Sequence, residues 1–333
     1  MPLSRPLAES VIVLTGASSG IGAATAGALA RRGATVVLAG RRVDPLVGVA
    51  RRCRDVGGRA LVVPTDVADP NAVDRLAERA VAEYGHLDGW VNNAAVALFA
   101  PLPEAPLADL RRVVEVNLLG YLYGVRAAIP RMRGSGGGVV VNNASVLGVV
   151  TVPTMGAYTI AKHGVLALSA TLRQDLRQAG DTGISVCTCL PASIDTPFYR
   201  HAANYTGRLP RPVPPVYPPD VAARAIVGLL RRPRRQAYAG GAGRLLAAQW
   251  RLLPGVTEWM LTHYAGRTQF ADRPAPVGPG NVFEPLADHP SYVAAVDDGW
   301  HGRRATALRR TVAAAAGAAG ALATAAVVRQ FRG

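Results

Sequence analysis

A glycine-rich turn joins the first apolar run of the chain to its first helical segment, and no other feature restricts the possible folds as strongly. Residues Val11–Leu14 lead directly into TGASSGIG at 15–22, with glycines at positions 16, 20 and 22. Such a turn lets backbone N–H groups approach a pyrophosphate at the positive end of a helix. Its place between a strand and a helix favours a dinucleotide-binding turn over an ordinary structural one.

Short β-rich runs then alternate with helical segments. We expect seven strands, at 11–15, 35–39, 60–64, 88–92, 138–143, 184–190 and 236–239. Helices are expected at 20–32, 44–56, 71–84, 107–132, 157–178 and 219–230. This order is typical of an α/β fold, and half of the 333 residues are hydrophobic, enough for a large core. The sequence therefore predicts a Rossmann-like, doubly wound, parallel seven-stranded sheet with helices on both faces.

Two segments break this alternation. Residues 191–219 contain eight prolines and follow the sixth expected strand, at the edge of the sheet where ligands bind in open α/β folds. We interpret them as a substrate loop within a dinucleotide-binding catalytic domain at 8–267. Residues 268–333 are interpreted as an irregular or helical C-terminal extension.

The charge of the chain is asymmetric. The net charge is +15, and residues 200–333 hold 18 basic against 7 acidic side chains. Such a field favours an anionic surface, although solvated arginines alone would also explain it. A nucleic-acid partner is not expected, because no recognition motif is present. The stretch 311–328 is uncharged, flanked by Arg310 and Arg329, and rich in alanine. Either a membrane-anchoring helix or a packing tail fits it.

Cysteine and histidine show no metal-ligand or disulfide spacing. The cysteines are Cys53, Cys187 and Cys189, and the six histidines are scattered. The first ten residues, MPLSRPLAES, lack the apolar run of a secretory signal. We expect no metal and a cytoplasmic protein, with a membrane association through the C-terminal tail, peripheral or anchored, as the alternative to a free one.

The end of the second expected strand bears on cofactor choice. An acidic residue there would bind the ribose of NAD, but Gly40 is followed by Arg41 and Arg42. A guanidinium matches a phosphate by charge and by its planar fork of donors. NADP(H) is therefore expected over NAD(H).

The only lysine, Lys162, follows Tyr158 by four residues in a chain with 36 arginines. Positions i and i+4 share one face of a helix, so both side chains can reach one ligand. An ammonium group near a phenol favours the phenolate and lowers its pKa. Tyr158 could then exchange a proton with a carbonyl or alcohol oxygen, and Lys162 could also bind the nicotinamide ribose.

These motifs together resemble the short-chain dehydrogenase/reductase family over roughly residues 10–265. The matching positions are TGASSGIG at 15–22, Asn92-Asn93-Ala94-Ala95, Asn117 in VNLLG, Ser145 in VNNASVLG, and Tyr158 with Lys162. The resemblance implies that Ser145 holds the substrate oxygen and that Tyr158 is the general acid/base. It also implies that Lys162 lowers the pKa of Tyr158 and that Asn117 supports a water-linked proton path.

The resemblance further implies a set of cofactor contacts and a homo-oligomer, a dimer or tetramer packed through helices. The expected contacts are Gly16, Ser18, Ser19, Gly20, Ile21, Gly22, Arg41, Arg42, Asp66, Val67, Asn93, Ala94, Ala95, Tyr158, Lys162, Pro191, Ala192, Ile194 and Thr196. Ala95 and Ala192 stand where the family has glycine. We expect a changed fit near the nicotinamide there, provided that neither position requires positive φ.

The function predicted is hydride transfer between NADP(H) and a hydrophobic alcohol or ketone. Aromatic and polar residues at 195–205 are typical of an apolar pocket wall with a few orienting contacts. His163 and His201 are interpreted as structural. The alternative is a protein of the same fold that senses NADP(H) without turnover.

Overall fold

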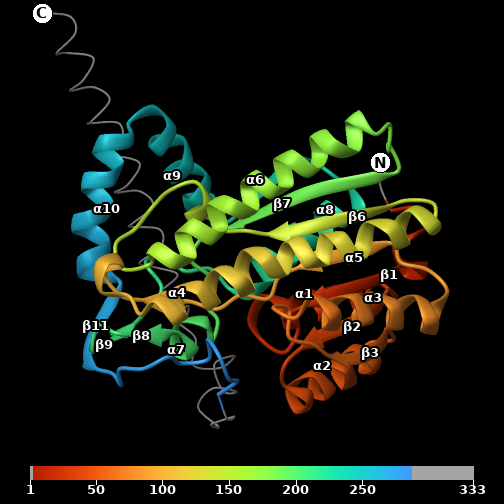
Figure 1. Ribbon diagram of the computed structural model, residues 1–333, viewed down its shortest axis with the longest axis horizontal. Helices are drawn as coiled ribbons and strands as arrows, with labels where there is room; N and C mark the ends of the chain where they lie inside the picture. The colour runs from red at the N-terminus through yellow and green to blue at the C-terminus, as the bar shows by residue number, and fades with distance from the viewer. Residues whose placement is uncertain (1–2, 287–333) are drawn as a thin grey trace, which may run out of the picture.

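A computed structural model describes residues 3–286, and its centre is a parallel sheet of seven strands (Figure 1). Their order is β3-β2-β1-β4-β6-β7-β10, which is the predicted doubly wound arrangement. The strands are β1 Val11–Thr15, β2 Thr35–Gly40, β3 Arg59–Pro64, β4 Gly89–Asn92, β6 Gly138–Asn143, β7 Ile184–Pro191 and β10 Gln236–Ala239. The seven predicted strands are confirmed within about one residue at each end.

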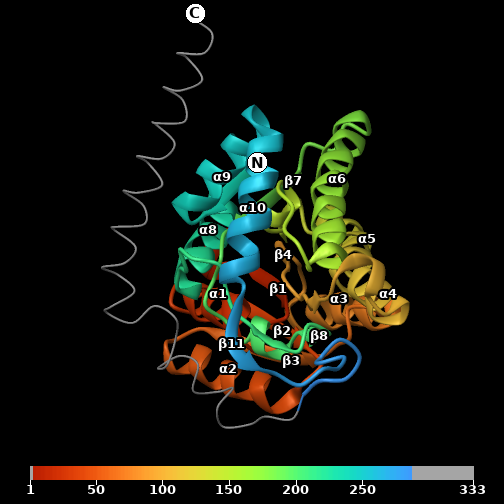
Figure 2. The ribbon, with the colours of Figure 1, turned by 90° about the vertical axis from the view of Figure 1, so that its left-hand side faces the viewer.

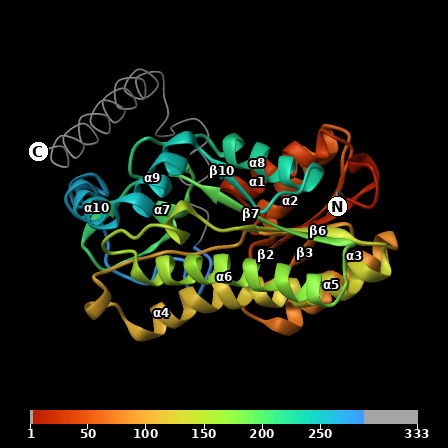
Figure 3. The ribbon, with the colours of Figure 1, turned by 90° about the horizontal axis from the view of Figure 1, so that it is seen from above.

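Helices cover both faces of the sheet (Figure 3). One face carries α1 Gly20–Ala30, α2 Val43–Asp55 and α8 Pro219–Arg231; the other carries α3 Pro70–Tyr84, α5 Gly120–Gly134 and α6 Gly156–Gln178. Every residue of β1, β2, β4 and β6 is buried, because both sides of these strands meet helices. Short 3-10 turns lie at Leu7–Glu9, Leu102–Glu104 and Val146–Gly148.

The single helix predicted at 107–132 is wrong in one respect. The chain forms α4 Leu107–Val114, a π-helical turn at Glu115–Leu119, and then α5. The wider turn carries Asn117, which is fully buried. The Asn117 amide accepts a hydrogen bond from Val96 N at 2.9 Å and donates one to Val96 O at 2.8 Å. Its pairing with the loop after β4 accompanies the widening of the helix.

The connection from β7 to β10 crosses the sheet in an unusual way. From β4 to β6 to β7 the chain advances across the sheet through α5 and α6 on one face. It continues in the same direction to β10, but α8 packs beside α1 on the opposite face. This crossover therefore has the hand opposite to the usual right-handed one. The segment 192–218 must pass over the carboxyl edge of the sheet to reach α8.

This segment is the predicted substrate loop, and it contains short elements. They are α7 Phe198–His201, β8 Ala203–Asn204 and β9 Arg208–Pro210. Strand β8 pairs with β5 Leu98–Phe99, which follows β4. The loop is thus held to the domain by a second, two-stranded sheet.

The end of the described chain folds back over the loop (Figure 2). Helices α9 Gly241–Leu252 and α10 Pro254–Thr268 form a hairpin, and β11 Phe270–Pro274 pairs antiparallel with β9. Residues 278–282 then contact the substrate loop through Asn204 and His201. The first part of the predicted extension, 268–286, therefore lies against the catalytic domain. The predicted helix 311–328 lies outside the described residues. Among residues 3–286, no helix has the length and apolarity to cross a membrane.

Candidate active site

A cavity of about 320 Å³ lies over the carboxyl edge of the sheet. The β1–α1 turn, the ends of β2, β4 and β6, the start of α6, and the substrate loop all contribute to its wall. Helices α9 and α10 and residues 281–286 add the outer part. Every residue predicted to contact the cofactor lines this one cavity.

Each of the three glycines in the β1–α1 turn is required by its backbone conformation, by lack of space, or by both. Gly16 and Gly20 have φ values of 65° and 52°, a conformation that favours glycine. A Cβ atom at Gly22 would lie 2.1 Å from Gly16 O, and one at Gly16 would lie 2.7 Å from Ala94 Cα. The turn therefore presents bare backbone at the start of α1, which is the surface that a pyrophosphate requires. A dinucleotide fits this cradle.

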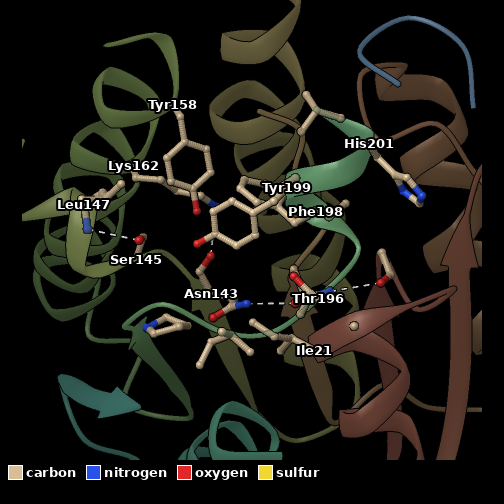
Figure 4. Close-up of a pocket in the computed structure, with 18 of the residues that line it drawn as sticks. Ile21, Asn143, Ser145, Leu147, Tyr158, Lys162, Thr196, Phe198, Tyr199 and His201 are labelled. Atoms are coloured by element: carbon tan, nitrogen blue, oxygen red, sulfur yellow. Dashed lines mark hydrogen bonds between the residues drawn. The ribbon is translucent and has the colours of Figure 1, made fainter. Parts of the chain in front are cut away.

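Three of the four predicted catalytic residues meet in the cavity. Ser145, Tyr158 and Lys162 lie together opposite Phe198 and Tyr199 of the substrate loop (Figure 4). Ser145 precedes a 3-10 turn, and its Oγ accepts a hydrogen bond from Leu147 N at 3.1 Å. The Tyr158 ring packs edge-on against Phe198 with centroids 5.3 Å apart.

The fourth predicted residue, Asn117, does not reach the cavity wall formed by the described chain. Its neighbour Val116 does. The Asn117 amide is engaged with Val96, which also lines the cavity. Asn117 thus fixes the backbone of the loop after β4.

The pKa of Tyr158 differs from the expectation that Lys162 lowers it. Burial raises the pKa of the phenol well above its usual value, while a hydrogen bond with the Ser145 hydroxyl acts in the opposite direction. Burial also lowers the pKa of Lys162 to about 7. The Lys162 Nζ atom lies 5.5 Å from the centre of the Tyr158 ring and makes its hydrogen bonds elsewhere. Desolvation therefore outweighs the attraction between ammonium and phenolate in this structure.

Lys162 is held by two groups that the sequence did not indicate. Its Nζ donates to Tyr121 Oη and to Asn143 O, each at 3.0 Å. Tyr121 is fully buried, and its hydroxyl donates to Asn143 O at 2.9 Å. A signal was available: Tyr121 follows Asn117 by four residues, so both would share one face of the predicted helix.

The opposite end of the cavity carries Arg41 and Asp66. Arg41 donates from Nη1 to Phe283 O and from Nη2 to Asn281 O, both at 2.6 Å. Asp66 accepts from Ala68 N and forms an ion pair with Arg112. Arg112 and residues 281–283 were not among the predicted site residues.

Comparison with known proteins agrees with this geometry. The pattern of the short chain dehydrogenase family matches residues 10–205. The chain belongs to the short-chain dehydrogenase/reductase family. A relative from Sinomonas cyclohexanicum, cis-4-hydroxycyclohexanecarboxylate dehydrogenase, is 41% identical over 71% of this chain and 90% of its own.

Two solved structures share the fold of this dehydrogenase. A short chain dehydrogenase/reductase from Burkholderia phymatum in complex with NAD has a TM-score of 0.67 and 27% identity, over 75% of this chain and 95% of its own. An alcohol dehydrogenase from Thermococcus sibiricus complexed with 5-hydroxy-NADP has a TM-score of 0.60 and 27% identity, over 69% and 95%. Members of this fold family thus bind NAD(P) nucleotides, and the chain is an oxidoreductase acting on alcohols or ketones.

The two departures from the family pattern fit the backbone of this dehydrogenase. Neither Ala95 nor Ala192 has a positive φ, so neither position requires glycine. The Ala192 methyl group faces two glycines of the α9 segment. Cβ atoms added at Gly240 and Gly243 would lie 3.0 and 3.1 Å from Ala192 Cβ. The glycines provide the space that the methyl group needs.

The substrate side of the cavity is mainly apolar. Its wall includes Leu147, Val152, Met155, Phe198, Tyr199, Val213, Leu246 and Leu261. His201, interpreted from sequence as structural, lines the cavity as well. Arg211 and Gln269 also line it, although sequence reasoning did not single them out. Within residues 3–286, no cluster of three His, Cys, Asp or Glu side chains could hold a metal ion.

Proposed function

We propose that this dehydrogenase transfers hydride between NADP(H) and the carbonyl or alcohol carbon of a hydrophobic substrate, with Tyr158 as general acid/base. The observation that carries the proposal is the meeting of Tyr158, Ser145 and Lys162 in the cavity that the β1–α1 cradle also lines. When bound, the dinucleotide supplies or accepts the hydride.

The remaining chemistry belongs to the side chains. In carbonyl reduction the Ser145 hydroxyl holds the substrate oxygen, and the Tyr158 phenol gives it a proton. In alcohol oxidation the ionised form of Tyr158 accepts the proton of the alcohol. Burial favours the protonated phenol over that form, and the phenol is the form that donates in carbonyl reduction. Lys162, with a pKa near 7, can exchange a proton at neutral pH and restore the phenol.

Substitution of the phenol tests this proposal. Tyr158→Phe should lower kcat by about 10²–10⁴-fold, the usual contribution of a general acid, and leave the Kd for NADPH unchanged. Tyr205→Phe is the matched control, because its hydroxyl bonds Asp109 and does not line the cavity. Tight NADPH binding without turnover of any carbonyl or alcohol in the wild type would support the sensor alternative instead.

The preference for NADP(H) is a proposal that rests on Arg41 and Arg42. Both line the cavity at the end of β2, and no acidic residue follows that strand directly. Two of the five N–H groups of Arg41 bond Asn281 and Phe283, which leaves three for a 2′-phosphate. Arg41→Ala should raise the KM for NADPH far more than the KM for NADH. Equal increases in the two KM values would contradict a preference for NADP(H).

The hydrophobic substrate is supported by the apolar wall and by the relative that acts on a hydroxylated cyclohexane ring. We expect turnover of cyclic or lipid-like secondary alcohols in a panel assayed by NADPH absorbance. The panel should include cis-4-hydroxycyclohexanecarboxylate, its methyl ester, and small charged alcohols without an apolar body. Turnover of the last group alone would refute this part of the proposal.

We also propose a homo-oligomer, a dimer or tetramer that packs through the outer helices. Leu107 of α4 and Ile160 of α6 are 68% and 50% exposed, large values for apolar side chains. Light scattering should give a mass of two or four chains. Ile160→Asp should shift that mass toward one chain.

A cytoplasmic protein at an anionic membrane surface is the proposed location. The three cysteines are buried and unpaired, as expected in a reducing compartment. Leu252, the last residue of α9, is 78% exposed and follows Arg251, and Trp259 in α10 is 65% exposed. Flotation with phosphatidylglycerol vesicles should recover the protein. Two variants would show which region binds the vesicles. Deletion of residues 287–333 removes the tail, and the double change Leu252→Asp, Trp259→Asp alters the α9–α10 hairpin.

A further inference from the structure

We propose that Arg211 binds a carboxylate of the substrate, so that this enzyme acts on hydroxy or keto acids whose apolar body lies between Arg211 and Tyr158. The inference rests on the proposed function and names the substrate class of the same site. It makes Arg211, which lines the cavity together with Gln269, a specificity-determining residue.

The position of Arg211 is fixed by its own hydrogen bonds. It follows β9, and its backbone N–H donates to Gln269 O at 2.8 Å. Its side-chain Nε donates to Thr268 O at 2.7 Å. One of the five guanidinium N–H groups is thereby used, and the two terminal nitrogens make no hydrogen bond or ion pair with the described chain. Those nitrogens form the fork that binds a carboxylate with two parallel bonds.

The charge of Arg211 is not neutralised in the cavity. Among the described residues that line it, the only carboxylate is Asp66, which pairs with Arg112. Lys162 is held by Tyr121 and Asn143, and Arg41 lies at the adenosine end against residues 281–283. An uncompensated guanidinium in a mainly apolar wall selects an anion and disfavours a second cation.

Gln269 places a second polar group next to Arg211. Its side chain is buried, with 2% of the residue exposed, and its Nε2 donates to Thr154 Oγ1 at 3.1 Å. The buried Oε1 atom has no hydrogen-bond partner. A rotation of the amide by 180° would let the Thr154 hydroxyl donate to Oε1 and would leave the NH₂ group as a donor. A carboxylate accepts from both residues in that arrangement.

The path from this polar end to the reacting group is apolar. Phe270, the next residue after Gln269, packs in one apolar cluster with Met155 and Tyr158. Val152, Phe198 and Tyr199 pack against the same cluster. A ligand with its alcohol at Tyr158 and its carboxylate at Arg211 would bury a ring or chain along this wall. A hydroxy acid with an apolar body has that order of groups.

Binding to the NADPH-loaded enzyme tests the inference without turnover. Cyclohexanecarboxylate and cyclohexanecarboxamide have nearly the same shape and differ in charge. We expect the wild type to bind the carboxylate at least 10-fold more tightly by calorimetry. Arg211→Gln should abolish this preference and leave the carboxamide Kd and the NADPH Kd unchanged. Arg211→Lys, which keeps the charge and loses the fork, should retain part of it.

Arg208→Gln is the matched control, because Arg208 lies three residues away, pairs with Asp272 and does not line the cavity. In turnover, Arg211→Gln should raise the KM for cis-4-hydroxycyclohexanecarboxylate about 10- to 100-fold and leave that for its methyl ester unchanged. Equal binding of carboxylate and carboxamide to the wild type would overturn the inference. Equal loss of carboxylate binding and carboxamide binding in Arg211→Gln and Arg211→Lys would also overturn the inference. A carboxylate preference in an enzyme that turns over no alcohol would refute the proposed function alone.

Discussion

Replacement of Lys162 by methionine should make the protein more stable and inactive. The amine is fully buried, and burial lowers its pKa from 10.5 to about 7. At about 1.4 kcal/mol per pKa unit, this shift lowers the free energy of unfolding by roughly 5 kcal/mol at a pH where the amine of the unfolded chain is charged. Methionine has a similar length and no charge, but it gives up hydrogen bonds to Tyr121 and Asn143, worth about 1 kcal/mol each. We therefore expect a net gain of about 2–3 kcal/mol at pH 7.

The stability difference between the wild type and Lys162→Met depends on pH. Between pH 7 and 10.5 the unfolded chain binds a proton at Lys162 that the folded chain does not bind, so wild-type stability rises with pH by about 1.4 kcal/mol per unit. Below pH 7 both states bind the proton, and this contribution to the slope vanishes. The Lys162→Met variant lacks the amine, so its advantage is largest below pH 7 and disappears toward pH 10.5.

Urea unfolding at pH 6, 7, 8 and 9, without cofactor, measures the difference between the two proteins. Since the chain has one lysine, lysine-labelled protein gives a single side-chain amine whose pKa can be read by NMR. Parallel stability curves for variant and wild type, or an amine that titrates near 10, would show that burial does not dominate at this site.

Three further changes probe the frame of the site. Gly22→Ala should weaken NADPH binding at least 10-fold and lower Tm, because its Cβ would lie 2.1 Å from Gly16 O. The control is Gly228→Ala, whose Cβ would meet nothing within 4 Å. It should stabilise α8 by up to about 1 kcal/mol and leave NADPH binding unchanged. Tyr121→Phe should remove an acceptor from Lys162, so the pH profile of kcat should move to lower pH while the NADPH KM stays constant. Gly280→Ala, at φ 52° and 2.4 Å from two loop carbonyls, should raise the alcohol KM and increase protease cleavage after residue 274. Unchanged NADPH binding, an unmoved profile and unchanged cleavage, respectively, would contradict these expectations.

The sheet could be predicted because its signals are local. Each strand is a short apolar run ended by turn residues. The glycines at 16, 20 and 22 can be recognised in a single sequence, and the lack of space around the turn is the reason that glycine stands there. The positions of Ser145, Tyr158 and Lys162 follow from the strand and helix that carry them. The π-helical turn at 115–119 could not be predicted, since VVEVNLLGYL contains no proline and a single glycine is tolerated in a helix, and since the turn accompanies a contact with the distant Val96.

Contacts across long sequence separations account for most of what the sequence did not indicate. Arg41 meets Phe283 across 242 residues, and Arg211 meets Thr268 across 57. The sequence around Arg41 or Arg211 does not indicate which distant residue the arginine contacts. The pKa of Tyr158 was misjudged for a related reason: spacing on a helix places Lys162 near the phenol but does not reveal that burial surrounds both groups.

The reversed crossover between β7 and β10 limits how the substrate loop can open. Both ends of the loop are anchored, one in β7 next to the edge strand β10 and the other in α8, which packs beside α1 on the opposite face from α6. Opening has to occur by flexing within 192–218 and cannot occur by peeling one end away. New specificities in proteins of this design should therefore arise from residues within the span, while the two anchors stay constant.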